Sequence, residues 1–126
     1  MATILVVDDE RAITELLSDL LSDEGHVVLV CHDGASALLA IQAQPPDLLI
    51  LDVGLPVMTG DTVLRTLRTQ GYADLPIIIS TAGTNPDRHL ADGATAILAK
   101  PFALDQVVTL VNRLLEQRAV GQRRSG

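Results

Sequence analysis

Short runs of consecutive apolar residues alternate along the chain with segments whose apolar residues recur every three or four positions. The runs predict five strands, at residues 4–7, 27–30, 48–51, 77–79 and 96–99. The periodic segments predict helices at residues 34–43, 61–69 and 104–115, and a short one within 83–92. A further helix is predicted by the spacing of Ile13, Leu16, Leu17, Leu20 and Leu21, and Gly25 is typical of a residue that ends such a helix.

The strand–helix unit, repeated five times, predicts an α/β fold. The strand runs are continuously apolar instead of alternating with polar residues. This is typical of parallel strands that helices bury on both faces. We therefore expect a single doubly wound, five-stranded parallel sheet with helices on both faces and right-handed crossovers.

The chain has 126 residues, a length that suits one domain with its own core. We expect this domain to span residues 1–118, followed by a basic, disordered tail at 119–126. There is no apolar run of the roughly 18 residues that cross a bilayer, and the N-terminus does not resemble a signal peptide. Cys31 is the only cysteine, so an internal disulfide is excluded. These features favour a cytoplasmic protein with no membrane partner.

The formal net charge is −7, which disfavours direct binding to nucleic acid because the phosphates would be repelled. The basic residues at the C-terminal end are more typical of a solubilising tail. Among the nine basic residues, Lys100 is the only lysine.

Polar residues that could take part in chemistry follow four of the expected strands. Asp8 and Asp9 follow the first strand, Asp52 the third, and Lys100 the fifth, while the fourth runs into Ser80–Thr81. In an open parallel sheet, ligands bind beyond the carboxyl ends of the strands. We therefore expect three carboxylates, a hydroxyl and the lysine to meet at one edge.

Three neighbouring carboxylates repel one another unless a cation joins them. An oxygen-only set suits Mg²⁺ or Mn²⁺, and we expect no histidine or cysteine at these strand ends that would favour zinc. A carboxylate beside such an ion can attack phosphorus, while a lysine neutralises phosphoryl oxygens. Taken singly, Asp9 could simply cap the helix that begins near Arg11. The joint occurrence at adjacent strand ends favours a site.

Four segments in this order resemble the receiver domains of response regulators in two-component signalling. They are Asp8–Asp9 after an apolar strand, the Asp-Val-Gly-Leu-Pro-Val-Met-Thr-Gly run at 52–60, Thr81–Ala82, and Lys100–Pro101–Phe102. The resemblance extends from about residue 3 to residue 117. It implies the flavodoxin-like strand order 2-1-3-4-5.

The resemblance also implies a role for each acid. Asp52 would accept a phosphoryl group from a phosphohistidine on a histidine kinase or a histidine phosphotransfer protein. Asp52 would also be among the residues that hold Mg²⁺ (or Mn²⁺); Asp9 would bind the ion directly, Asp8 would bind it through water, and the backbone carbonyl of Gly54 would complete the protein ligands. Such a protein is a signalling phosphoacceptor that catalyses only its own phosphorylation and dephosphorylation, and it switches a surface that binds an output target.

The remaining family positions lie around the phosphoacceptor. Thr81 and Lys100 would contact the phosphoryl oxygens and take part in the transfer with Asp52. Pro101, Pro56 and Gly60 would shape the backbone of the site, and the resemblance implies a cis bond before Pro101.

The chain departs from the family pattern at three places. Many receivers carry Tyr or Phe three residues before the lysine, where this chain has Ile97, so the aromatic part of the usual switch is missing. The segment 83–92 predicts a fourth helix about one turn shorter than usual. Gly54 and Gly83 place no side chain at the site, and we expect slow hydrolysis of the phosphoryl group.

Three other functions fit the same fold less well. A flavin binder needs hydroxyls or backbone N–H groups where this chain has Asp8 and Asp9. A phosphatase with an aspartyl nucleophile typically has a second acid two residues later, where this chain has Gly54. A module that is never phosphorylated would not need the acids. His26, His32 and His89 are expected to be incidental, because none is predicted at a strand's carboxyl end.

Overall fold

Five strands and five helices alternate along the part of the chain that the computed structural model describes, residues 1–83 and 85–125, with side chains through residue 120. The strands are β1 (Thr3–Val7), β2 (Val27–Cys31), β3 (Leu48–Asp52), β4 (Ile77–Thr81) and β5 (Ala96–Ala99). The helices are α1 (Arg11–Asp23), α2 (Gly34–Ala43), α3 (Gly60–Thr69), α4 (Asp87–Ala91) and α5 (Leu104–Ser125).

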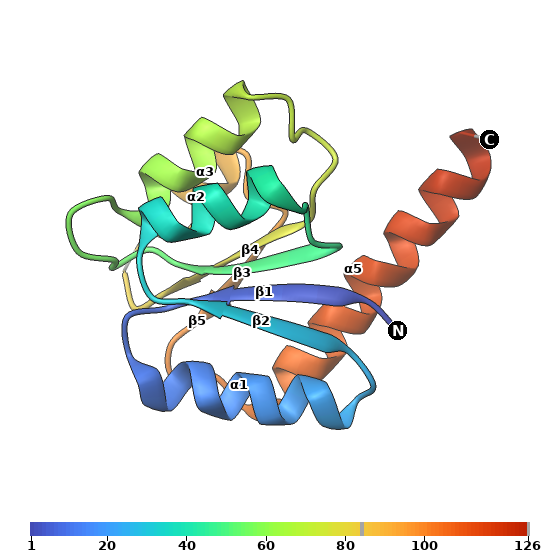
Figure 1. Cartoon of the computed structure of the whole chain (residues 1–126), viewed down its shortest axis with the longest axis horizontal. Helices are drawn as coiled ribbons and strands as arrows, with labels where there is room; N and C mark the ends of the chain where they lie inside the picture. Colours follow the sequence, from blue (N-terminus) through green and yellow to red (C-terminus); the bar gives the residue numbers. More distant parts are fainter. Residues whose placement is uncertain (84, 126) are drawn as a thin grey trace.

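The strands form one parallel sheet in the order β2-β1-β3-β4-β5, which confirms the expected topology. In Figure 1, α2 and α3 lie on one face of the sheet and α1 lies on the other. The registers pair Val7 with Leu51 and Asp52 with Ser80, so the carboxyl ends of the central strands are level with one another. That edge is where a site is expected.

Each face of the sheet has its own hydrophobic core, because successive side chains of a strand point to opposite faces. Leu5 and Val7 of β1 belong to the core beneath α2 and α3. Ile4 and Val6 belong to the core that α1 and α5 cover. The residues of β3 and β4 are all buried, so the two central strands that lead to the site are held rigidly from both sides.

Two sequence expectations about burial were wrong. Strand β2 is not buried on both faces: Val27 and Leu29 are 45% and 43% exposed. The reason is that β2 lies at the edge of the sheet and pairs with β1 alone. Leu16 was expected on the inner face of α1 but is 46% exposed, while Thr14 on that helix is buried.

Helix α5 continues through the expected domain boundary at residue 118 as far as Ser125. The backbone of the expected tail is therefore helical up to that residue, and residue 126 lies outside the described residues. The division into a domain and a tail stays a prediction.

Helix α4 has five residues, which confirms that the fourth helix is short. Thr84, in the same expected segment, lies outside the described residues. Among the helices that the structure describes, none has both the length and the apolar character needed to cross a bilayer.

Candidate functional site

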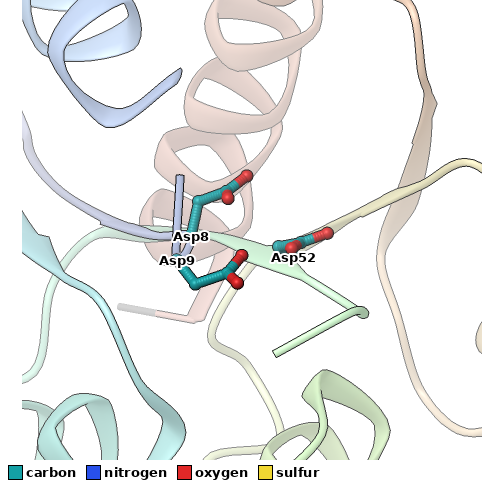
Figure 2. A group of neighbouring side chains, drawn as sticks. All are labelled: Asp8, Asp9 and Asp52. Atoms are coloured by element: carbon teal, nitrogen blue, oxygen red, sulfur yellow. The ribbon is translucent and has the colours of Figure 1, made fainter. Parts of the chain in front are cut away.

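Three carboxylates meet at the carboxyl edge of the sheet, as the sequence predicted. Asp8 and Asp9 directly follow β1, and Asp52 ends the neighbouring strand β3 (Figure 2). One oxygen from each lies within 4.8 Å of the others. Asp8 and Asp52 are 3% and 6% exposed, whereas Asp9 faces solvent. The N-cap of α1 is Glu10, so Asp9 does not have the capping position that was its alternative explanation.

Lys100 joins this cluster from the residue after β5. Its Nζ lies 3.3 Å from Oδ2 of Asp8 and 3.2 Å from Oδ1 of Asp52. Burial would lower the pKa of Lys100, but hydrogen bonding and attraction to Asp52 and Asp8 outweigh burial, and the pKa is raised. The lysine is therefore a fixed positive charge between two acids.

The charge of Asp8 is poorly compensated. Its pKa is raised, first by burial and then by the charge of Asp52, although hydrogen bonds from Glu10 N–H and Lys100 oppose the shift. Three carboxylates and one ammonium leave the cluster with a formal charge of −2.

We expect Asp8→Asn to stabilise the protein when divalent cations are chelated. The amide keeps an oxygen that can accept the Glu10 hydrogen bond but removes a buried charge, so the free energy of unfolding should rise by about 1 kcal/mol. Urea unfolding in chelator measures this change. Asp19→Asn, on the exposed face of α1, is the control and should change it by less than about 0.5 kcal/mol. A lower free energy of unfolding for Asp8→Asn would show that the charge is well accommodated.

Thr81 ends β4 and is 3% exposed. Its Oγ1 accepts a hydrogen bond from the backbone N–H of Gly83 at 2.9 Å. The hydroxyl keeps its own proton to donate elsewhere. The backbone N–H of Lys100 donates to the carbonyl of Thr81 at 2.8 Å, so the hydroxyl and the ammonium come from adjacent positions of the sheet edge.

The loop from β3 to α3 folds back against the backbone of Asp52. The N–H of Gly60 donates to the carbonyl of Val53 at 3.1 Å. A Cβ at Gly60 would lie 2.3 Å from the carbonyl oxygen of Asp52, so only glycine fits there. Pro56 lies in this loop, and its carbonyl accepts from Met58 N–H at 2.7 Å. The peptide bond before Pro101 is cis, as the resemblance implied.

The acidic cluster suits a hard divalent cation. Within the described residues, the possible metal-ligating side-chain atoms of the cluster are carboxylate oxygens alone, and the formal charge of −2 that remains after Lys100 is counted matches one such ion. Gly54 is exposed two residues after Asp52, beside the same hollow. Oxygen ligands and surplus negative charge are what Mg²⁺ requires.

A hollow of about 580 Å³ opens beside the cluster. Its lining residues are Asp9, Glu10, Asp52, Val53, Gly54, Thr81, Ala82, Gly83, Asn85, Arg88, His89 and Lys100. Two residues of this set, Arg88 and His89, belong to α4 and were not predicted as site residues. His89 was set aside as incidental, but it is buried and lines the hollow.

The expected position of His32 was also wrong. Strand β2 extends to Cys31, one residue beyond its expected end, so His32 does lie at a strand's carboxyl end. Its Nδ1 is 3.0 Å from the backbone carbonyl of Asp8 and its Nε2 is 3.4 Å from Arg11. His32 thus contacts the backbone beside the cluster, whereas His26 lies at the opposite end of the strand.

Comparisons with known proteins agree with this geometry. The family model described as "Response regulator receiver domain" matches residues 4–112. The response regulator MprA of Mycobacterium ulcerans is 43% identical over 117 residues, which cover 90% of this chain and 50% of that protein. The chain thus spans about half the length of the curated relatives it matches.

Solved structures give the same result. The receiver domain of the Francisella response regulator 1452 superposes with a TM-score of 0.88 at 30% identity, covering 93% of this chain and 98% of that one. The chemotaxis response regulator CheY4 of Vibrio cholerae has a TM-score of 0.84 at 36% identity, covering 90% and 98%.

Proposed function

The chain belongs to the response regulator receiver domain family of two-component signalling, and on that premise we propose that Asp52 is its phosphoacceptor. The observation that carries this proposal is the place of Asp52. Its carboxylate is almost buried, lies among two other acids, is 3.2 Å from the only lysine, and lines an open hollow. A nucleophile, charge compensation and access for a phosphodonor are therefore present at one point.

The transfer itself is a displacement at phosphorus. An oxygen of Asp52 attacks the phosphorus of a phosphohistidine, the phosphorus–nitrogen bond breaks, and the imidazole leaves with the electron pair. Lys100 and the hydroxyl proton of Thr81 neutralise the phosphoryl oxygens as charge builds up on them. Response regulators receive phosphoryl groups from histidine kinases, so the proposed donor is a histidine kinase or a histidine phosphotransfer protein.

We further propose that Mg²⁺, or Mn²⁺ in its place, is the cofactor. Asp9 and Asp52 would bind the ion directly, Asp8 through water, and Gly54 through its backbone carbonyl. When bound, the ion neutralises phosphoryl oxygens and removes the repulsion among the three acids. Asp8 and Asp9 serve the transfer by holding this charge beside Asp52.

We expect Asp9→Asn to weaken Mg²⁺ binding and to slow phosphoryl uptake from acetyl phosphate. Substitution of residues that only support metal ligands typically lowers metal affinity by 10- to 100-fold. Loss of a ligand carboxylate should therefore lower it by at least about tenfold. Calorimetric titration with Mg²⁺ measures the affinity, and intact-protein mass spectrometry measures the uptake. Glu10→Gln is the matched control, because Glu10 lines the same hollow but is outside the carboxylate cluster.

Chelation of divalent cations should stop uptake in all these proteins. If uptake continued in chelator, or if Asp9→Asn bound Mg²⁺ as tightly as Glu10→Gln, the cofactor assignment would be wrong. The assignment of Asp52 would then have to stand on other grounds.

A phosphatase with the same nucleophile is a weaker candidate. Gly54 stands where such enzymes place the acid that protonates the leaving group, and it provides no side chain. We expect no significant turnover of small phosphate esters. A cytoplasmic location and an output target for the phosphorylated form are part of the proposal.

A further inference from the structure

A buried histidine on α4 lines the hollow. His89 of α4 is 2% exposed, and its Nδ1 lies 2.7 Å from Oδ1 of Asp61 in the first turn of α3. The other oxygen of Asp61 accepts from Nη2 of Arg88 at 3.2 Å. Asp61 therefore fixes the orientation of the imidazole ring.

This contact also decides which ring nitrogen carries the proton. An ionised carboxylate can only accept hydrogen bonds, so Nδ1 of His89 must donate to Asp61. In the neutral ring, Nε2 is then the nitrogen with the free lone pair. A carboxylate that holds a histidine in this tautomer is the arrangement by which many enzymes prepare an imidazole to accept a proton.

His89 and Asp52 line the same hollow, together with Gly54 and Gly83. A Cβ at Gly54 would meet, within 4 Å, only the carboxylate oxygens of Asp52, at 3.7 and 4.0 Å. A Cβ at Gly83 would meet only Oγ1 of Thr81, at 3.1 Å. Neither glycine places a side chain in this hollow, whose volume is about 580 Å³. A water molecule takes up about 30 Å³, so the hollow can hold a phosphoryl group and water together.

We propose that His89 is a catalytic residue for the loss of the phosphoryl group from Asp52, an inference that rests on the proposed function. Nε2 orients a water molecule, whose oxygen attacks phosphorus. The phosphorus–oxygen bond to Asp52 breaks, and the carboxylate leaves with the electron pair. The proton of the water passes to Nε2 and then to solvent, and inorganic phosphate departs. Slow hydrolysis was expected because Gly54 and Gly83 place no side chain at the site. His89 provides the group that orients water, which these two glycines lack.

A structural role is the alternative, because the contacts of Asp61 with Arg88 and His89 also attach α4 to α3. The two roles differ in which step they affect. Uptake of the phosphoryl group involves no attacking water, so an orienting residue should affect hydrolysis alone. A residue that only supports the site should affect both steps and the stability of the protein.

Two substitutions separate these roles. His89→Asn keeps an amide N–H near Nδ1 for Asp61 but has no counterpart of Nε2. His89→Gln is longer and places a polar group where Nε2 lies, so it should orient water in part. His26→Gln is the control, because His26 lies at the other end of the sheet and contacts the N–H of Ala2.

Each protein is phosphorylated with acetyl phosphate and Mg²⁺, freed of donor by desalting, and followed by intact mass over time. We expect the half-life of the phosphorylated form to increase about tenfold in His89→Asn and less in His89→Gln, with uptake rates and melting temperatures near those of the wild type. His26→Gln should decay at the wild-type rate.

An unchanged half-life in His89→Asn would overturn the inference and leave Asp52 as phosphoacceptor untouched. Parallel losses of uptake and stability in both His89 variants would also overturn it in favour of the structural role. A wild-type protein that takes up no phosphoryl group would overturn the proposed function itself, and this inference with it.

Discussion

Replacement of Lys100 by methionine should slow phosphoryl uptake about 100-fold or more. Lys100 places the ammonium nearest to Asp52, at 3.2 Å, and it is the only lysine of the chain. Phosphoryl transfer depends on charge stabilisation at the phosphoryl oxygens, and loss of one aligned donor of this kind typically costs 10²–10³ in rate. Methionine keeps much of the length of the side chain, so the change removes charge and hydrogen bonds without opening a large cavity.

The same substitution should have the opposite effect on the metal. With the ammonium gone, the carboxylates of Asp8 and Asp52 lose their partner, and the cluster becomes more negative. Mg²⁺ affinity should therefore rise while uptake falls, a pair of results that a partly unfolded variant would not produce. Arg65→Met, which removes an exposed arginine paired with Asp92, is the control and should change neither quantity. Uptake by Lys100→Met at the wild-type rate would remove the lysine from the mechanism.

A methyl group at Gly60 should have the largest effect on stability. The new Cβ would lie 2.3 Å from the carbonyl oxygen of Asp52 and 2.7 Å from Cα of Val53. Both atoms belong to the backbone and cannot rotate away, so the loop between β3 and α3 must shift. We expect Gly60→Ala to lower the free energy of unfolding by about 3 kcal/mol, measured by urea unfolding, and to displace Asp52 from Lys100.

Gly54→Ala is the matched control for that experiment. It adds the same methyl group six positions earlier in the same loop, where the nearest atom would be an oxygen of Asp52 at an ordinary contact distance of 3.7 Å. The free energy of unfolding should change by less than about 0.5 kcal/mol. Equal effects of the two substitutions would show that the close approach of Gly60 to the Asp52 backbone is not what makes glycine necessary.

The acidic cluster and the lysine were predictable because parallel strands place their carboxyl ends at one edge. Asp8, Asp52 and Lys100 are far apart in the chain, but each directly follows or ends an apolar run. Runs of this kind indicate strand ends to within a residue or two, which is enough to place a side chain at the edge of a sheet. The strand order itself came from the resemblance, since short apolar runs do not specify their neighbours.

The remaining features depend on tertiary structure that local pattern does not contain. The apolar run of β2 reads like those of the central strands, so nothing in it shows that Val27 and Leu29 are on an edge. The pair formed by Asp61 and His89 joins two helices across 28 positions, and α4 is too short to have a readable period. The sequence nevertheless contained an indication of this pair. Both residues lie in segments that follow strands, at the edge of the sheet where the site was expected.

Locating the phosphorylated residue by mass spectrometry shows directly whether Asp52 accepts the phosphoryl group. The protein and Asp52→Asn are treated with acetyl phosphate and Mg²⁺, and the modified residue is located by mass spectrometry of the intact proteins and their peptides. We expect one added phosphoryl group on the wild type, located at Asp52, and none on Asp52→Asn or in chelator. A phosphoryl group at another residue, or equal uptake by Asp52→Asn, would show that Asp52 is not the phosphoacceptor.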